Sequence, residues 1–326
     1  METRKIQSIG GSSFSLVLPK KWVEAQKLKN KSEVAIEIQK SGRLVIMPKE
    51  KKDIHRKKVS IAALEGEELY REVIVLYILG LEEVELTAGP ITLKQKQVVR
   101  QVCQKLAGME IIEEASDYIF LKSFLDPQKF SFEEYLSKIF VMTRLMFSDS
   151  IRAFLTHNKD LAADVIDRDF EVDKIDFLFS RMKHALMSGF VSEEELNVSL
   201  GQADFYQNIA RQLERIADHA VKISRLVQTS PVSLNTKWEK ILQTNSQRIN
   251  EFLAAAEKFV KSSDKKAANS LIKEVAKSSH HDSPVFSEMV KSGYGAGLIL
   301  SDSFDRVSSY IVNMAEHTLA QAAIDA

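Results

Sequence analysis

The sequence predicts a multidomain protein with a small all-β domain at its N-terminus, a small α/β domain in the middle and an all-α domain at its C-terminal end. Three observations predict this. Short β-like runs fill residues 3–48, strand-like and helix-like segments alternate over 57–124, and apolar residues recur every three or four positions over 131–323. A chain of 326 residues is also long for one core, so two or three domains are expected.

Composition indicates a cytoplasmic protein. Cys103 is the single cysteine, so no disulfide can form within one chain and a reducing compartment is expected. No apolar run approaches the roughly 20 residues that span a bilayer, and the first residues lack the apolar region of a signal peptide. We therefore expect no membrane insertion.

Charge is divided unevenly along the chain, although the net charge is zero. Residues 1–58 contain 15 Lys and Arg against 6 Asp and Glu, whereas the remainder contains 30 basic against 39 acidic residues. A basic N-terminal part on an acidic body indicates contact with a polyanion. The alternative is that the two parts attract each other.

The N-terminal domain, residues 1–50, is predicted from four strand-like runs. They cover 4–9, 14–19, 33–39 and 43–48, and a short helix is expected over 20–24. The dipeptides Gly10-Gly11 and Ser41-Gly42 predict turns between strands. The order of runs predicts two hairpins joined by a helical turn.

The run RKIQSIGGSSFSLVLPKKW resembles the SpoVT/AbrB-type swapped-hairpin domain. In that family two chains interleave to form one barrel, and basic strands and loops contact DNA. The resemblance implies a homodimer through this domain and phosphate contacts from Arg4, Lys5, Lys20 and Lys21. Ser12 and Ser13 stand where that family often has an Arg after the turn glycine. The alternative is a dimerisation module with solvated lysines.

The middle domain, residues 57–124, follows a charged linker and is predicted to have the order β-α-β-α-β-β. It has no glycine-rich phosphate loop and no cluster of His, Ser or Cys, so nothing in it indicates catalysis. Asp126-Pro127 breaks the chain before the all-α part.

Six helices are predicted after this break, over 131–158, 160–188, 197–227, 234–262, 264–279 and 284–323. Three helices followed by three more give a period near 100 residues. The run LERIADHAVKIS resembles the third helix of the PhoU repeat. The resemblance implies a tandem three-helix bundle, with repeat one at 131–229 and repeat two at 234–323, and a phosphate uptake regulator of archaeal type.

Carboxylates line one edge of two predicted helices. Glu214 and Asp218 are four residues apart beside an apolar seam, and Asp169, Asp173 and Asp176 lie on one flank of the preceding helix. Such pairs repel unless something cationic lies between them. If the two edges face each other, four or five carboxylates converge.

An oxygen-only set of this kind suits a hard cation such as Mg²⁺ or Ca²⁺, or an iron or zinc cluster bridged by water or hydroxide. The PhoU resemblance implies a metal cluster at E/D-x-x-x-D pairs and favours iron or zinc over Mg²⁺ or Ca²⁺. The alternative is two ordinary solvated helix edges. His184 and His219 lie off the acidic flank and are expected to be surface or packing residues.

The second repeat departs from this pattern, since Ser309 and Tyr310 stand where Asp218 and His219 stand in the first. A second carboxylate cluster is therefore not expected. His280, His281 and Asp282 precede Pro284 and are expected to lie in a loop.

We therefore predict a DNA-binding transcriptional regulator of phosphate homeostasis with a metal-binding body. The alternative is an adaptor without DNA binding that docks on a phosphate transporter or its sensor histidine kinase. A di-metal carboxylate enzyme is the third hypothesis. Ferritin-like di-iron helices use Glu-x-x-His pairs, and the acidic edges have none. The prediction is thus that the protein is not an enzyme.

Overall fold

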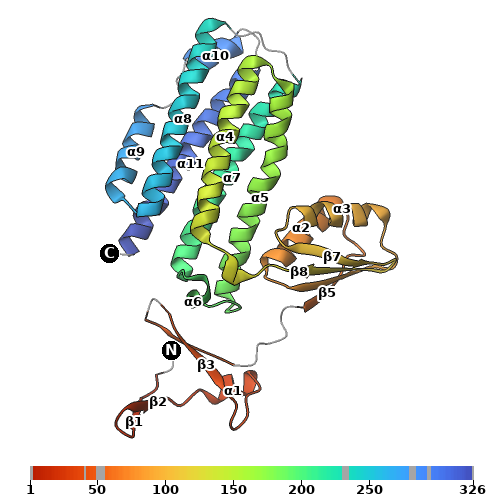
Figure 1. Ribbon diagram of the computed structural model, residues 1–326, viewed down its shortest axis with the longest axis vertical. Helices are drawn as coiled ribbons and strands as arrows, with labels where there is room; N and C mark the ends of the chain where they lie inside the picture. Colours follow the sequence, from red (N-terminus) through yellow and green to blue (C-terminus); the bar gives the residue numbers. More distant parts are fainter. Residues whose placement is uncertain are drawn as a thin grey trace. The chain divides into compact units, whose positions relative to one another are not determined.

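The computed structural model describes residues 3–39, 42–48, 56–229, 235–278, 284–291 and 295–324 (Figure 1). Two compact units divide the chain, Met1–Ile54 and His55–Ala326. Small strand hairpins, an α/β region and a helical bundle follow one another along the chain, which confirms the predicted fold class.

The N-terminal unit consists of two hairpins and a short helix. Strand β1 (Gln7–Ile9) pairs with β2 (Ser13–Ser15), and β3 (Val34–Ile38) pairs with β4 (Leu44–Pro48), in both cases antiparallel. Helix α1 (Lys20–Ala25) lies between the hairpins in sequence. Gly10 and Gly11 form the first turn with φ of +64° and +82°, a conformation that favours glycine. Within residues 3–39 and 42–48 the hairpins form two separate two-stranded sheets and do not close a barrel.

Apolar side chains of this unit face outward. None of its described residues is buried. Large hydrophobic residues are more than two-fifths exposed at eight positions: Ile6, Ile9, Phe14, Leu16, Val17, Ile36, Ile38 and Leu44. Two-stranded hairpins without a covered apolar face are marginal in water. The described part of the unit therefore lacks a hydrophobic core within one chain.

The α/β region contains a four-stranded sheet with two helices. Its elements are β5 (Arg56–Ser60), α2 (Gly66–Ile78), β6 (Glu83–Thr87), α3 (Leu93–Gln104), β7 (Met109–Glu114) and β8 (Tyr118–Ser123). The strand order is β5-β6-β8-β7, with β5 and β6 parallel and the other pairs antiparallel. This confirms the predicted β-α-β-α-β-β order. A capping box of Thr92 and Gln95 begins α3, and the Gln95 amide also donates to the Ile61 carbonyl at 2.9 Å.

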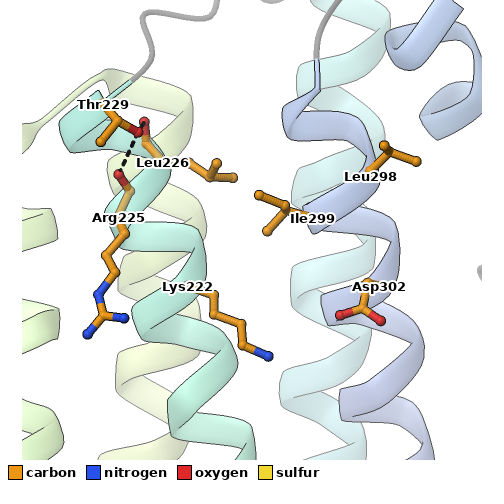
Figure 2. A pocket seen from close by; sticks show the side chains of 7 residues that line it. All are labelled: Lys222, Arg225, Leu226, Thr229, Leu298, Ile299 and Asp302. Carbon is orange, nitrogen blue, oxygen red and sulfur yellow. Dashed lines mark hydrogen bonds between the residues drawn. The ribbon is translucent and has the colours of Figure 1, made fainter.

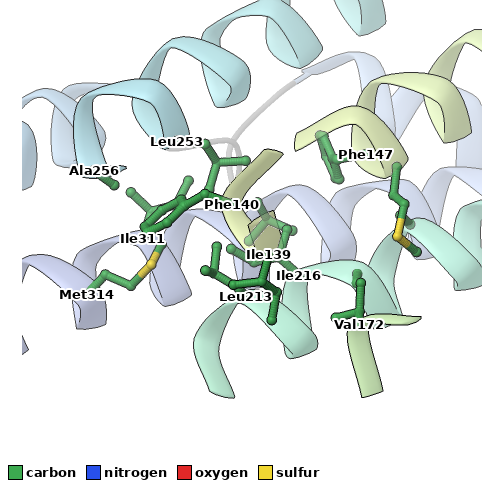
Figure 3. Packing of buried hydrophobic residues seen from close by; sticks show 14 of the residues in the cluster. Ile139, Phe140, Phe147, Val172, Leu213, Ile216, Leu253, Ala256, Ile311 and Met314 are labelled. Carbon is green, nitrogen blue, oxygen red and sulfur yellow. The ribbon is translucent and has the colours of Figure 1, made fainter. Parts of the chain in front are cut away.

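The helical bundle begins after the short helix η1 (Pro127–Lys129). Its helices are α4 (Phe132–Thr156), α5 (Lys159–Met187), α6 (Glu193–Leu196), α7 (Leu200–Thr229), α8 (Thr236–Ser262), α9 (Lys265–Lys277), α10 (Pro284–Lys291) and α11 (Ala296–Ile324). Figure 3 shows side chains from both halves of the bundle meeting in one core: Phe140 of α4, Leu213 of α7, Leu253 of α8 and Ile311 of α11. The helices before and after residue 230 therefore share one core.

Two helix boundaries differ from the prediction. The third long helix begins at Leu200 and not at Asn197, because Asn197 has φ +54° and ends the short helix α6. The predicted helix over 284–323 is two helices, α10 and α11. A Cβ built at Gly297 would lie 2.9 Å from the Cβ of Met289, so the glycine permits the close approach of these two helices.

Among the described residues, no helix combines the length and the apolar character needed to cross a membrane.

Candidate metal centre

The five predicted carboxylates lie on facing edges of α5 and α7. The apolar residues beside them, Val172, Leu213 and Ile216, are fully buried between the helices. Arg211 links the two edges: its Nη1 lies 2.8 Å from Oδ2 of Asp176 on α5 and 3.8 Å from Oε2 of Glu214 on its own helix. We call Asp169, Asp173, Asp176, Glu214 and Asp218 the carboxylate centre.

Burial and mutual repulsion disfavour negative charge in the carboxylate centre. Burial, with help from Asp173 and Asp218, raises the pKa of Asp169 to about 6. Burial also raises the pKa of Asp176 to about 6 and that of Glu214 to about 8, although Arg211 opposes both shifts. The pKa of Asp218 is raised by burial and by Asp173. Ionising these carboxylates is therefore unfavourable unless a further positive charge enters the centre.

Among the described residues, two cations form ion pairs with members of the carboxylate centre. Arg211 is one, and Lys105 at the end of α3 is the other, with its Nζ 2.8 Å from Oδ2 of Asp173. Sequence reasoning missed both. Arg211 stands three residues before Glu214, a spacing that permits an ion pair on one helix. Lys105 lies 68 positions from Asp173 in sequence, and no local pattern connects them.

The carboxylate centre has free oxygen ligands for a cation, but its side chains must rotate before they can share one ion. Oδ1 of Asp169 and Oδ1 of Asp176 are buried without a hydrogen-bond partner among the described residues, which leaves two carboxylate oxygens for a positive ligand. Yet across the described parts of the chain no three His, Cys, Asp or Glu side chains are placed to hold one ion. A metal would therefore bind only after rotation of these carboxylates.

The face of α5 that points away from the bundle core attaches the α/β region to the bundle. Phe177 packs against the core of the α/β region. Arg181, only 4 % exposed, donates to the carbonyl of Tyr77 and to those of Gly80 and Leu81 at 3.4 and 3.2 Å. Its guanidinium also lies 4.6 Å from the centre of the Tyr77 ring. Arg181 thereby satisfies carbonyls at the C-terminal end of α2.

His184 and His219 take no part in the carboxylate centre. His219 is 3 % exposed and lies between α7 and α11, with Nδ1 3.1 Å from Oγ of Ser303. Burial lowers its pKa to about 4, so the ring is neutral. His184 contacts Ser188 one turn along α5. Both are packing or surface residues, as expected. His280, His281 and Asp282 lie outside the described residues.

A separate cavity of about 460 Å³ lies between α7 and α11 (Figure 2). Its wall is mainly apolar: Leu226 faces Ile299 across the gap, while the Arg225 side chain extends away from Ile299. Lys222 points toward α11. None of the five carboxylates lines this cavity, so it is distinct from the carboxylate centre.

The predicted DNA-contacting residues are all exposed. Arg4 and Lys5 precede β1, and Lys20 and Lys21 form the first turn of α1. Lys20 is 87 % exposed and lies 3.7 Å from Glu24 on the same helix. These side chains are accessible to a polyanion.

Comparison with known families identifies two segments. Residues 136–227 match the family model of the PhoU domain. Residues 7–53 match the antidote-toxin recognition protein MazE, a bacterial antitoxin. No curated protein matches the chain. The chain thus combines a PhoU domain, which contains the whole carboxylate centre, with an N-terminal MazE/AbrB-like domain, as the sequence predicted.

Proposed function

We propose that the protein is a DNA-binding regulator of phosphate uptake, with a dimeric N-terminal unit and a metal-binding bundle. The observation that carries this proposal is the presence of a PhoU domain and a MazE-type domain in one chain. The PhoU domain supports a role in phosphate homeostasis. The N-terminal domain supports dimerisation and DNA binding. Both families are regulatory, which favours a regulator over an enzyme.

Dimerisation is supported by the outward-facing apolar residues of the N-terminal unit. Exposed apolar clusters of this kind mark surfaces that another protein covers. A second copy of the same unit would supply complementary hairpins and the missing core. In this arrangement the N-terminal unit folds only as a homodimer.

DNA binding is supported by the exposed basic residues Arg4, Lys5, Lys20 and Lys21. The test is fluorescence anisotropy with a labelled duplex from upstream of the protein's own gene, titrated at several salt concentrations. Affinity should fall steeply with salt because phosphate contacts release counterions. The double variant Lys20→Ala/Lys21→Ala should lower the salt slope by about 2 or more. The matched control is Lys265→Ala/Lys266→Ala, two exposed lysines at the start of α9.

The adaptor hypothesis is favoured by the acidic body and by Ser12 and Ser13 after the turn. It predicts a dimer that binds no duplex at any salt concentration and that instead binds a phosphate transporter component or its sensor histidine kinase. If both double variants bind DNA with the same salt-sensitive affinity, Lys20 and Lys21 do not contact DNA.

Metal binding by the carboxylate centre is supported by its two partnerless oxygens and its raised pKa values. We expect iron or zinc, with Mg²⁺ or Ca²⁺ as the alternative. Asp169, Asp173 and Asp218 would supply oxygen ligands, together with Asp176 and Glu214 once Arg211 moves. The bound cation would offset the charge repulsion between α5 and α7.

Elemental analysis of the purified protein tests this expectation. The variant Asp173→Asn/Asp218→Asn should lose the metal. The control Asp160→Asn/Asp164→Asn changes two exposed residues at the start of the same helix α5 and should keep it. A metal-free wild type, purified with metal present, would contradict the proposed site.

A further inference from the structure

Lys105 brings a cation into the carboxylate centre from another part of the fold. It is the residue at the C-terminal end of α3, in the α/β region, whereas Asp173 belongs to α5 of the bundle. Its Nζ lies 2.8 Å from Oδ2 of Asp173 and 6.0 Å from the ring centres of Tyr70 and Phe170. Three helices therefore surround this one ammonium group.

The Lys105–Asp173 pair can open without unfolding its surroundings. The two side chains are 23 % and 18 % exposed, so the lysine has a path into water along its flexible stem. Water can solvate the released ammonium and carboxylate groups, so opening this pair costs less than opening a fully buried one. Arg211 differs, since it shares a helix with Glu214 and moves with α7.

A divalent ion bound to Asp173 conflicts with the position of Lys105. Metal–carboxylate oxygen distances are about 2.0–2.2 Å for zinc, so the ion would lie within a few ångströms of the ammonium group. Like charges this close repel strongly in a partly buried site. The lysine and the metal therefore compete for the same carboxylate.

We propose that Lys105 is a tethered cation that occupies the metal-binding carboxylate Asp173 and must be displaced when a divalent ion binds, so that metal binding releases the end of α3 from α5. This inference rests on the proposed metal site. The two equilibria are linked: the Lys105–Asp173 ion pair weakens metal binding, and metal binding weakens the ion pair by the same free energy.

The rest of the junction would persist in the metal-bound state. Arg181 lies eight residues beyond Asp173 on α5, which is roughly 12 Å along a helix. Its bonds to the carbonyls at the end of α2 involve none of the carboxylates. Displacement of Lys105 therefore removes one contact between the end of α3 and α5, while Ala107 stays packed against the bundle core and Arg181 keeps α2 attached.

The test is isothermal titration of metal-free full-length protein with Zn²⁺. Lys105→Met, which removes the charge and keeps an unbranched side chain, should bind Zn²⁺ at least tenfold more tightly than wild type, or about 1.4 kcal/mol. The matched control is Lys183→Met. Lys183 is 24 % exposed and is also ion-paired between helices, with Asp204 at 3.2 Å. Its affinity should stay within about twofold of wild type.

Hydrogen exchange provides the second measurement. Zn²⁺ should speed exchange of the amides of Lys105 and Leu106, which close the end of α3, at least threefold in wild type and leave them unchanged in Lys105→Met. If Lys105→Met does not give a folded protein by circular dichroism, Lys105→Gln replaces it in both experiments.

The outcomes separate this inference from the proposed function. Equal Zn²⁺ affinity in wild type and Lys105→Met, with exchange unchanged, would overturn the role of Lys105 and leave the metal site in place. Zn²⁺ binding by neither protein would overturn both. Tighter binding in Lys105→Met, combined with faster exchange in wild type only, would support the displacement.

Discussion

Replacing Arg181 by Met should destabilise the unit that contains the α/β region and the bundle. Arg181 is 4 % exposed and is held by three backbone carbonyls and by the face of Tyr77. Methionine fills most of the space and supplies no donor. The change therefore removes the arginine donor from the Gly80 and Leu81 carbonyls and leaves the Tyr77 carbonyl with the Gly80 N–H.

The magnitude follows from the number of lost bonds. Arg181→Met removes three hydrogen bonds, one of them long at 3.4 Å, and each bond to a charged donor contributes about 1.5–3 kcal/mol. Burial lowers the pKa of Arg181, so the native protein bears a desolvation cost that the variant escapes. We expect a net loss of about 3 kcal/mol in the free energy of unfolding.

The assay is urea unfolding followed by far-UV circular dichroism, with hydrogen exchange at the end of α2. The control Arg152→Met removes an arginine that is 65 % exposed and paired with Asp149, and should cost less than about 0.5 kcal/mol. Exchange should quicken at Leu79 and Gly80 in Arg181→Met only. If the Arg181 variant unfolds like the control, the carbonyl contacts do not hold the junction together.

Three other outcomes are expected. Because the pKa of Glu214 is raised from 4.5 to about 8 in the folded state, its stability contribution is complete below pH 4.5 and is lost as pH rises toward 8. Metal-free wild type should therefore melt at a lower temperature at pH 8 than at pH 5. At pH 7, Glu214→Gln should raise the free energy of unfolding by about 2 kcal/mol. The same pH dependence of the melting temperature in both proteins would contradict this. Phe14→Asp, at a position 71 % exposed, should convert a dimer into monomers by light scattering, whereas an unchanged mass would place the dimer contact elsewhere. Phe147→Ala removes a fully buried ring that packs edge-on against Phe304 at 5.5 Å, and should lower the free energy of unfolding by about 3–5 kcal/mol in urea; a loss below about 1 kcal/mol would contradict the packing.

The long helices could be predicted from the sequence because their buried faces repeat regularly. In α7, Ile209, Leu213, Ile216 and Ala220 are all fully buried, at the spacings that define a helical seam. The α/β region was predictable for a similar reason, since the spacing of apolar residues differs clearly between its helices and its strands. Helix ends were less predictable: Asn197 adopts a left-handed conformation that no periodicity signals.

Contacts between distant segments could not be predicted in the same way. The acidic edges of α5 and α7 were visible as spacings, but the cation nearest Asp173 comes from α3. Arg181 contacts residues about 100 positions earlier in the chain. Phe170 and Phe177 did indicate a second contact. They are seven residues apart, so they share a helix face, and that face differs from the one formed by Val172, Ile175 and Phe179. A second apolar stripe on a bundle helix predicts a second packing partner.

Helix α5 explains why the carboxylate centre and the α/β region are connected. One face of α5 enters the bundle core with Val172 and Phe179, and another carries Phe177 against the α/β core. The edge between them carries Asp173, which has the bundle helix α7 on one side and Lys105 of α3 on the other. A cation that draws Asp173 toward Asp218 must therefore take it from Lys105, since one carboxylate cannot serve both at full strength. Under the proposed metal binding, the same charge balance would set both the position of the α3 end and the metal affinity.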